Sequence, residues 1–148
     1  MKPDKFLTAH QQDTVVDAVR LAEKGTSGEI RIHIDCTCIG DPITRAKEVF
    51  DKLGMHKTQL RNGVLIYLAY ESKVFAIIGD KGIDELVTRD FWQDVAAVMK
   101  EEFMNGRFTE GLSKAALMVG EKLRDFFPYQ EDDMNEQPDD ISFGEKEL

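Results

Sequence analysis

Hydrophobic positions near the start of the chain recur at the spacing of one helical face. The apolar members of this first run are Val15, Val16, Val19 and Ala22. Thr8 stands where an N-cap is expected, and Gln11 three residues later completes a capping box. Gly25 then ends the run. The pattern predicts a first helix between Thr8 and Gly25.

The spacing then changes to strict alternation. Residues 29–35 alternate polar and apolar side chains, which predicts a strand with Ile30, Ile32 and Ile34 on its buried face and His33 pointing outward. Residues 64–69 form a nearly continuous apolar run, which is typical of a central strand covered on both faces.

A four-residue polar link separates the run at 64–69 from a further apolar run at 74–78. A link this short allows only a hairpin, so these two strands are predicted to be antiparallel. Between the first and second strands, Asp41 and Pro42 have the positions of an N-cap and a first helical residue, and Gly54 ends the helix. A strand, a helix and a strand in this order form a crossover, which makes strands one and two parallel.

The rest of the pattern is helical. A short amphipathic piece over 83–87 is followed by a helix for which Asp90 is the expected cap and Gly106 the end. Thr109 is the expected cap of a last helix that closes at Pro128. These elements together predict an α/β fold, a three-layer α/β/α sandwich with a small mixed central sheet.

Charge divides the chain into two parts. Of its 28 acidic residues, eight lie in 129–148, together with one of its 19 basic residues. Residues 1–128 are therefore predicted to form one domain of nearly neutral charge, and 129–148 an acidic disordered tail that lacks aliphatic periodicity. A neutral body has no basic footprint for nucleic acid. The start of the chain shows no targeting segment and no stretch long enough to span a membrane, which predicts a cytoplasmic location.

The predicted topology gathers polar residues at both edges of the sheet. One edge collects Glu29, Arg61, Asn62 and Asp80, with Lys81 and Asp84 directly after them. The opposite edge collects His33, Asp35, Cys36, Cys38, Asp41 and Glu71. A structural zinc site is not expected there, because four ligands at zinc spacing need a second close pair. The two cysteines are interpreted as free thiols.

Several short blocks of the chain resemble the TPM domain family. They include GEIRI at 28–32, RNGVLI at 61–66, IIGDKGI at 77–83, FW at 91–92 and GRF at 106–108. The resemblance extends over about residues 8–128. It implies an α/β/α sandwich and a divalent-metal site, usually of the calcium type, built from acids near one sheet edge. Some members of the family are assigned acid phosphatase activity, and others are accessory domains of membrane proteins.

The resemblance and the edge topology together yield the first functional hypothesis. It is a Ca²⁺-binding domain with metal-assisted hydrolysis of phosphomonoesters, in which the predicted metal ligands are Glu29, Asn62, Asp80 and Asp84. Arg61 is the predicted contact for an anion. No motif in the sequence identifies a nucleophile, so the catalytic residues stay unassigned.

Each of these residues also has a purely structural interpretation. Glu29 and Asp80 are both ion-pair partners within reach of Arg61, and Asp80 also stands where a helix cap is expected. Asn62 suits a turn before Gly63, and Asp84 suits a solvated helix face. The alternative hypothesis is therefore a non-catalytic protein-interaction domain, in which the polar edge is a salt-bridge network and a protein partner binds elsewhere.

Overall fold

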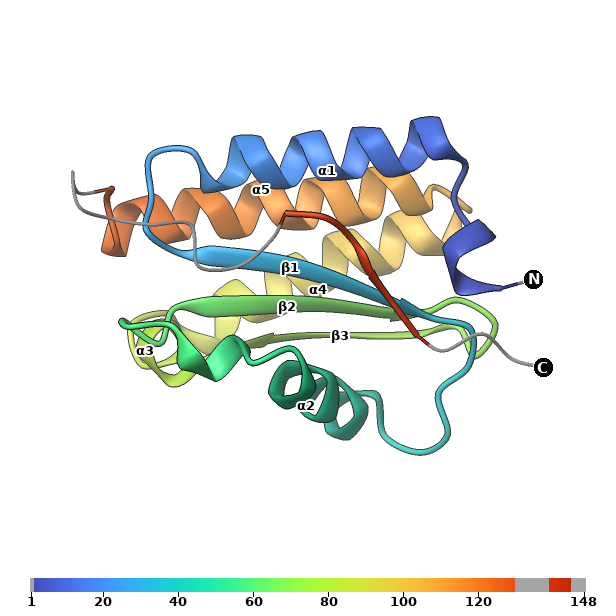
Figure 1. The fold of residues 1–148 in the computed structure, drawn as a ribbon, viewed down its shortest axis with the longest axis horizontal. Helices are drawn as coiled ribbons and strands as arrows, with labels where there is room; N and C mark the ends of the chain where they lie inside the picture. Colours follow the sequence, from blue (N-terminus) through green and yellow to red (C-terminus); the bar gives the residue numbers. More distant parts are fainter. Residues whose placement is uncertain (1, 130–138, 145–148) are drawn as a thin grey trace.

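The computed structural model of the chain describes residues 2–129 and 139–144 (Figure 1). The elements follow one another as η1 (Pro3–Lys5), α1 (Ala9–Glu23), β1 (Glu29–Asp35), α2 (Pro42–Lys52), η2 (Met55–Lys57), β2 (Gly63–Ala69), β3 (Val74–Gly79), α3 (Lys81–Asp84), α4 (Arg89–Met104), α5 (Phe108–Phe126) and β4 (Ser142–Phe143). None of the helices in these described residues is long and apolar enough to cross a membrane.

The sheet has the strand order β3-β2-β1-β4. β1 and β2 are parallel, with Glu29 opposite Gly63, whereas β2 and β3 form an antiparallel hairpin with Val64 opposite Gly79. The crossover through α2 and the hairpin are therefore both confirmed. They bring the start of β1, the start of β2 and the end of β3 to one edge of the sheet.

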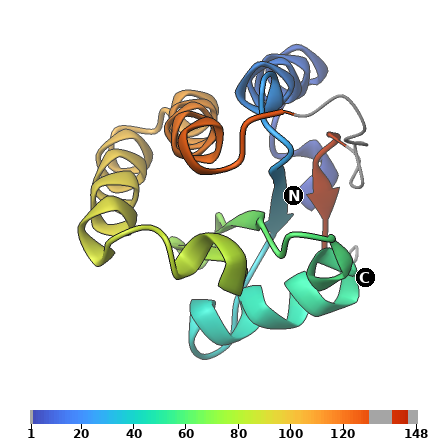
Figure 2. The same ribbon diagram turned by 90° about the vertical axis from the view of Figure 1, so that its left-hand side faces the viewer.

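Helices cover the sheet on both faces, as the side view makes clear (Figure 2). α1, α4 and α5 lie over one face, and α2 lies over the other (Figures 1 and 2). Alternate residues of each strand enter separate cores, since Ile32 and Ile66 pack on the side of α1 and α5 while Tyr67 packs on the side of α2. The predicted α/β/α sandwich with a mixed sheet is confirmed.

Local capping signals were interpreted correctly for two helices and wrongly for two others. Thr8 forms the capping box with Gln11, and Asp41 accepts a hydrogen bond from the backbone of its own helix. Helix α4, however, is capped by Thr88 and not by Asp90. Helix α5 begins at Phe108, before Thr109, and has no side-chain cap. In both cases the helix starts one residue before the polar residue chosen from the sequence.

A fourth strand corrects the prediction of a disordered tail over 129–148. Ser142 and Phe143 pair with His33 and Ile34 of β1, and the Gly144 amide donates to the Ile34 carbonyl at 2.9 Å. The prediction is wrong for 139–144 because the outer edge of β1 offers unpaired backbone groups that two residues suffice to engage. The rest of the predicted tail, at 130–138 and 145–148, lies outside the described residues.

Candidate functional site

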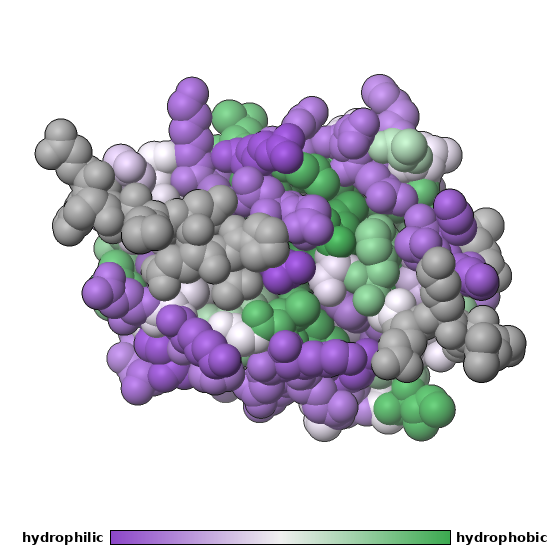
Figure 3. All heavy atoms as spheres, viewed as in Figure 1, coloured by the Kyte–Doolittle hydropathy of each residue, from purple (hydrophilic) through white to green (hydrophobic). Residues whose placement is uncertain are grey.

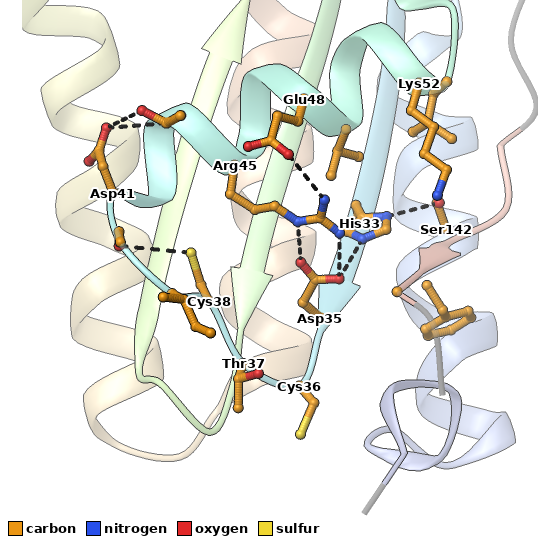
Figure 4. Close-up of a pocket in the computed structure, with 17 residues that line it drawn as sticks. His33, Asp35, Cys36, Thr37, Cys38, Asp41, Arg45, Glu48, Lys52 and Ser142 are labelled. Atoms are coloured by element: carbon orange, nitrogen blue, oxygen red, sulfur yellow. Dashed lines mark hydrogen bonds and ion pairs between the residues drawn. The ribbon is translucent and has the colours of Figure 1, made fainter. Parts of the chain in front are cut away.

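A pocket of about 720 Å³ opens at the carboxyl end of β1 (Figure 4). Its walls come from the end of β1, the loop 36–40, helix α2 and strand β4. It contains most of the second polar edge recognised in the sequence, including His33, Asp35 and Asp41. Hydrophilic side chains cover α2 in the lower part of the space-filling view (Figure 3).

His33 and Asp35 form the buried floor of this pocket. They alternate with the isoleucines of β1, so they face the layer of α2. The His33 Nε2 atom lies 2.8 Å from Asp35 Oδ1, and His33 Nδ1 lies 2.9 Å from the Ser142 hydroxyl. His33 lies on the face opposite the isoleucines, as the alternation predicts, but it is not an exposed histidine, because β4 and α2 cover this face and leave only 5% of the residue accessible.

Asp35 is the centre of a hydrogen-bonded network that joins β1, β2 and α2. Its Oδ2 accepts from the Tyr67 hydroxyl at 2.6 Å and from Arg45 Nε at 2.9 Å, and its Oδ1 accepts from Arg45 Nη2 at 3.4 Å. Burial by itself would raise the pKa of Asp35, but the hydrogen bonds from His33, Arg45 and Tyr67 outweigh it and hold that pKa well below its ordinary value. The carboxyl group therefore stays ionised.

The ionised Asp35 determines which nitrogen of His33 carries the proton. A carboxylate only accepts hydrogen bonds, so His33 Nε2 must be the donor toward it. In the neutral imidazole, Nδ1 is then an acceptor, and it receives the hydrogen of the Ser142 hydroxyl. The same aspartate raises the pKa of the Tyr67 phenol, together with burial, which is the larger cause.

Two basic side chains reach the pocket from helix α2. Arg45, Glu48 and Lys52 recur at helical spacing on one face of α2, and all three line the pocket. Glu48 Oε2 lies 3.8 Å from Arg45 Nη1. In Figure 4, Lys52 extends from the helix toward the end of the pocket where Ser142 lies. Asp35 holds the Arg45 guanidinium through two of its five N–H groups, so the outer side of the fork can meet a ligand.

The opposite edge of the sheet, where the metal ligands were predicted, contains an ion pair. Arg61 Nε and Nη2 bind the two oxygens of Asp80 at 2.6 and 2.9 Å, and the Lys81 amide donates to the same carboxylate at 2.8 Å. The Arg61 backbone has a positive φ of 52°. The ion pair that the structural interpretation of Arg61 and Asp80 expects is therefore present.

The other predicted ligands lie near this pair without converging on one point. Glu29 and Asn62 are both buried, and the Asn62 amide donates to Ser27 Oγ at 3.4 Å. Asp84 accepts instead from the Trp92 indole at 3.1 Å. Within 2–129 and 139–144, no three His, Cys, Asp or Glu residues are grouped as a metal site requires. Calcium takes six to eight oxygens, which this arrangement does not offer, so Ca²⁺ binding stays a prediction.

A third polar group surrounds the amino end of β1. Glu23, Glu29 and Asp139 line a second pocket, of about 500 Å³. Burial, a hydrogen bond with Asp139 and the nearby charges raise the pKa of Glu23 to about 10, although the Ile30 amide that donates to it at 2.7 Å acts in the opposite direction. Glu23 is therefore protonated at neutral pH.

The family model of the TPM domain, TPM_phosphatase, matches residues 1–122. The chain belongs to the TPM domain family. Among solved structures, this TPM domain is similar to the NMR structure of BA42 from the psychrophilic bacterium Bizionia argentinensis, with 45% identity and a TM-score of 0.89 over 95% of this chain and 97% of that one.

A more distant likeness shows the fold alone. The N-terminal domain of the cg2496 protein from Corynebacterium glutamicum aligns with a TM-score of 0.64 and 14% identity, over 80% of this chain and 74% of that one. The comparison with curated proteins finds no match. Strand β4 of this TPM domain lies beyond the residues that the family model matches.

Sequence reasoning found one edge of this TPM domain and overlooked the chemistry of the other. Arg45 and Ser142 were missed because neither is adjacent in sequence to His33 and Asp35. One local signal was present: a histidine and an aspartate two residues apart on a strand must share a face. An arginine one turn inside the following crossover helix starts close to that face, which makes the Asp35–Arg45 pair recognisable in retrospect.

The two cysteines, Cys36 and Cys38, are free thiols, as the sequence predicts.

Proposed function

We propose that this TPM domain binds a small phosphate-bearing molecule in the pocket at the carboxyl end of β1 and hydrolyses a phosphomonoester there. The observation that carries the proposal is the Arg45 guanidinium, clamped by Asp35 at the pocket wall and 32% exposed at its side chain. A fork fixed on one side is preorganised to bind phosphate oxygens with the other.

The position of the pocket supports this assignment. Open α/β sheets bind ligands beyond the carboxyl ends of their strands. The pocket lies at such a place, because β1 ends at Asp35 and the pocket opens there. A volume of about 720 Å³ is in the range of small-molecule sites. Lys52 adds a second positive charge to the pocket wall. The name of the matching family model, TPM_phosphatase, also supports a phosphatase.

The chemistry that hydrolysis needs is available among the lining residues. Transfer of a phosphoryl group needs positive charge on the phosphate oxygens and a group that accepts a proton from the attacking oxygen. Arg45 and Lys52 are suited to the first task, and the neutral imidazole of His33 to the second. A P–O bond forms to the attacking oxygen, the ester P–O bond breaks, and the leaving alcohol takes up the proton.

Binding of inorganic phosphate and hydrolysis of p-nitrophenyl phosphate test this proposal. Saturable amide shifts in the loop 36–40 and at the start of α2 are expected in the presence of phosphate. R45Q should weaken phosphate binding about tenfold, since one charge-assisted contact is lost. K47Q is the matched control, because Lys47 lies on the same helix but does not line this pocket. Equal affinity in wild type and R45Q would refute the site.

One observation favours the alternative, a protein-interaction role. Ile39 is 99% exposed in the loop 36–40, and apolar atoms protrude over this loop in the space-filling view (Figure 3). A protein partner that covers Ile39 should be retained by the immobilised wild-type domain in metal-free buffer and lost by I39S. Equal retention by both would remove Ile39 from the interface.

A further inference from the structure

We infer that Ser142 is a nucleophile, activated by His33 and oriented through it by Asp35, and that hydrolysis in the pocket passes through a covalent ester on Ser142. The substrate class, a phosphomonoester, rests on the proposed function. The identity of the nucleophile rests on geometry alone.

The three side chains form a continuous hydrogen-bonded row. Ser142 Oγ lies 2.9 Å from one imidazole nitrogen of His33, and the other nitrogen lies 2.8 Å from Asp35. Figure 4 shows the row leading from Asp35 through His33 to Ser142. A hydroxyl on a base that is itself oriented by a carboxylate is the arrangement by which hydrolases activate serine, and it is recognised by geometry and not by chain order.

Burial differs along the row in the way that nucleophilic catalysis requires. His33 and Asp35 are buried, whereas Ser142 is half-buried and lines the pocket. The hydroxyl is therefore the member of the row that a bound ester can reach. The base behind it is screened from water, and the imidazolium formed during attack lies against an ionised carboxylate.

The contacts of Asp35 keep it in the role of an orienting anion. Tyr67 and Arg45 both donate to it, so the carboxylate does not take the proton from His33. It holds Nε2–H in place, which leaves the lone pair of Nδ1 directed at Ser142. A network with this many donors also resists rotation of the imidazole ring, since Asp35 is tied to β2 and α2 at once.

The proposed reaction has two balanced steps. In the first, the Ser142 hydroxyl proton moves to His33 Nδ1, Oγ forms a bond to phosphorus, and the ester P–O bond breaks as the alcohol leaves with that proton. In the second, water gives a proton to Nδ1 and attacks phosphorus. The Oγ–P bond then breaks, and Ser142 regains its proton from His33. Arg45 and Lys52 are placed to offset the charge on the phosphoryl oxygens.

The hydrogen bond between Ser142 and His33 also joins β4 to β1. The test must therefore measure the reactivity of Ser142 as well as the stability of the fold. Diisopropyl fluorophosphate is a suitable probe, because Oγ displaces fluoride from phosphorus and leaves a stable phosphoester with loss of HF. Intact mass and peptide mapping should find a single adduct at Ser142 in the full chain.

Three variants separate a nucleophile from a structural hydroxyl. S142A should carry no adduct, and H33Q should react about a hundredfold more slowly because it lacks the base. S72A is the matched control, because Ser72 lies near the same end of the sheet but is bonded to backbone: its Oγ accepts from the Cys38 amide at 2.9 Å and donates to the Cys38 carbonyl at 3.4 Å. Its labelling should equal that of wild type. Amide spectra verify that each variant is folded.

The outcomes for the nucleophile and for the proposed function are distinguishable. Absence of an adduct at Ser142, or a labelling rate that H33Q does not lower, overturns the inference. An adduct at Ser142 without p-nitrophenyl phosphate hydrolysis supports the nucleophile and removes the phosphatase assignment. Hydrolysis that persists at the wild-type rate in S142A has the opposite meaning, since the function then stands without this serine.

Discussion

Tyr67 donates its phenolic hydrogen to Asp35 across 2.6 Å, between two neighbouring parallel strands. Both residues are buried, and the tyrosine ring also lies parallel to that of His33, with ring centroids 6.0 Å apart. The ring of Tyr67, on β2, belongs to the apolar core on the side of α2. Its hydroxyl group nevertheless donates a hydrogen bond to Asp35 at the floor of the pocket.

Removal of this hydroxyl should destabilise the domain. Y67F leaves one oxygen of a buried carboxylate with fewer donors, and hydrogen bonds to charged groups contribute about 1.5–3 kcal/mol. We expect a loss of about that size in the free energy of unfolding, measured by urea denaturation at neutral pH. Y129F is the matched control, because Tyr129 is 56% exposed and should change little. Equal stability of Y67F and wild type would show that the bond contributes nothing net.

Acid should weaken the fold through Asp35. Burial opposes ionisation of this group, but its three donors outweigh burial, and its folded pKa is lowered. Its stabilising contribution is therefore present above the ordinary aspartate pKa of about 4 and is lost as pH falls below it, because the unfolded chain takes up the proton first. D35N should be less stable than wild type at pH 7 and should lose stability less steeply in acid. Urea denaturation across this range measures both slopes, and D13N, on the exposed side of α1, serves as the control.

A rise in pH should weaken the fold through Glu23, whereas a fall in pH weakens it through Asp35. Burial and the Asp139 contact raise its pKa from 4.5 to about 10, so the folded chain holds a proton that the unfolded chain releases. The corresponding stability is complete below pH 4.5 and declines as pH rises toward 10. E23Q imitates the protonated acid and can still accept from the Ile30 amide. We expect E23Q to be more stable than wild type at pH 8, with a flatter dependence of the melting temperature on pH; parallel curves would contradict this.

A calcium titration tests the ligands predicted from the sequence. Asp80 binds Arg61 through both oxygens, so a cation must displace the guanidinium to bind there. R61Q releases Asp80 and should strengthen any calcium-dependent amide shifts at Asn62 and Asp80, whereas K81Q, which removes an equal charge next to Asp80, should not. Saturable shifts in chelator-treated wild type would establish a site at this edge. Their absence in both wild type and R61Q would show that these residues are not calcium ligands.

The elements that sequence reasoning located correctly are those determined by local spacing. The alternation over β1, the apolar run of β2 and the short link before β3 each indicate one strand, and the crossover rule orders them. The same topology brought Arg61 and Asp80 together before any contact was known. The glycine at position 82 is also explained locally, because a Cβ there would collide with the carbonyl oxygens of Leu60 and Arg61.

The pocket could not be predicted in this way because it depends on a contact between residues 109 positions apart. Alternation places His33 on the face opposite the isoleucines, but it does not say what covers that face. The cover comes from Arg45 on a helix and from Ser142 in a segment whose acidic composition suggested disorder. A two-residue strand has too short a pattern to be recognised, and its register is determined by the open edge of β1.

The position of β4 has a consequence for the order of events during synthesis. Every other described strand and helix has been translated before residue 139 is added. The exit tunnel of the ribosome encloses the most recently added residues, so α5 and β4 both emerge late. Until they do, the His33 imidazole lacks its contact with Ser142, and the outer edge of β1 is open. Closure of that edge is therefore among the last steps by which the chain reaches this fold.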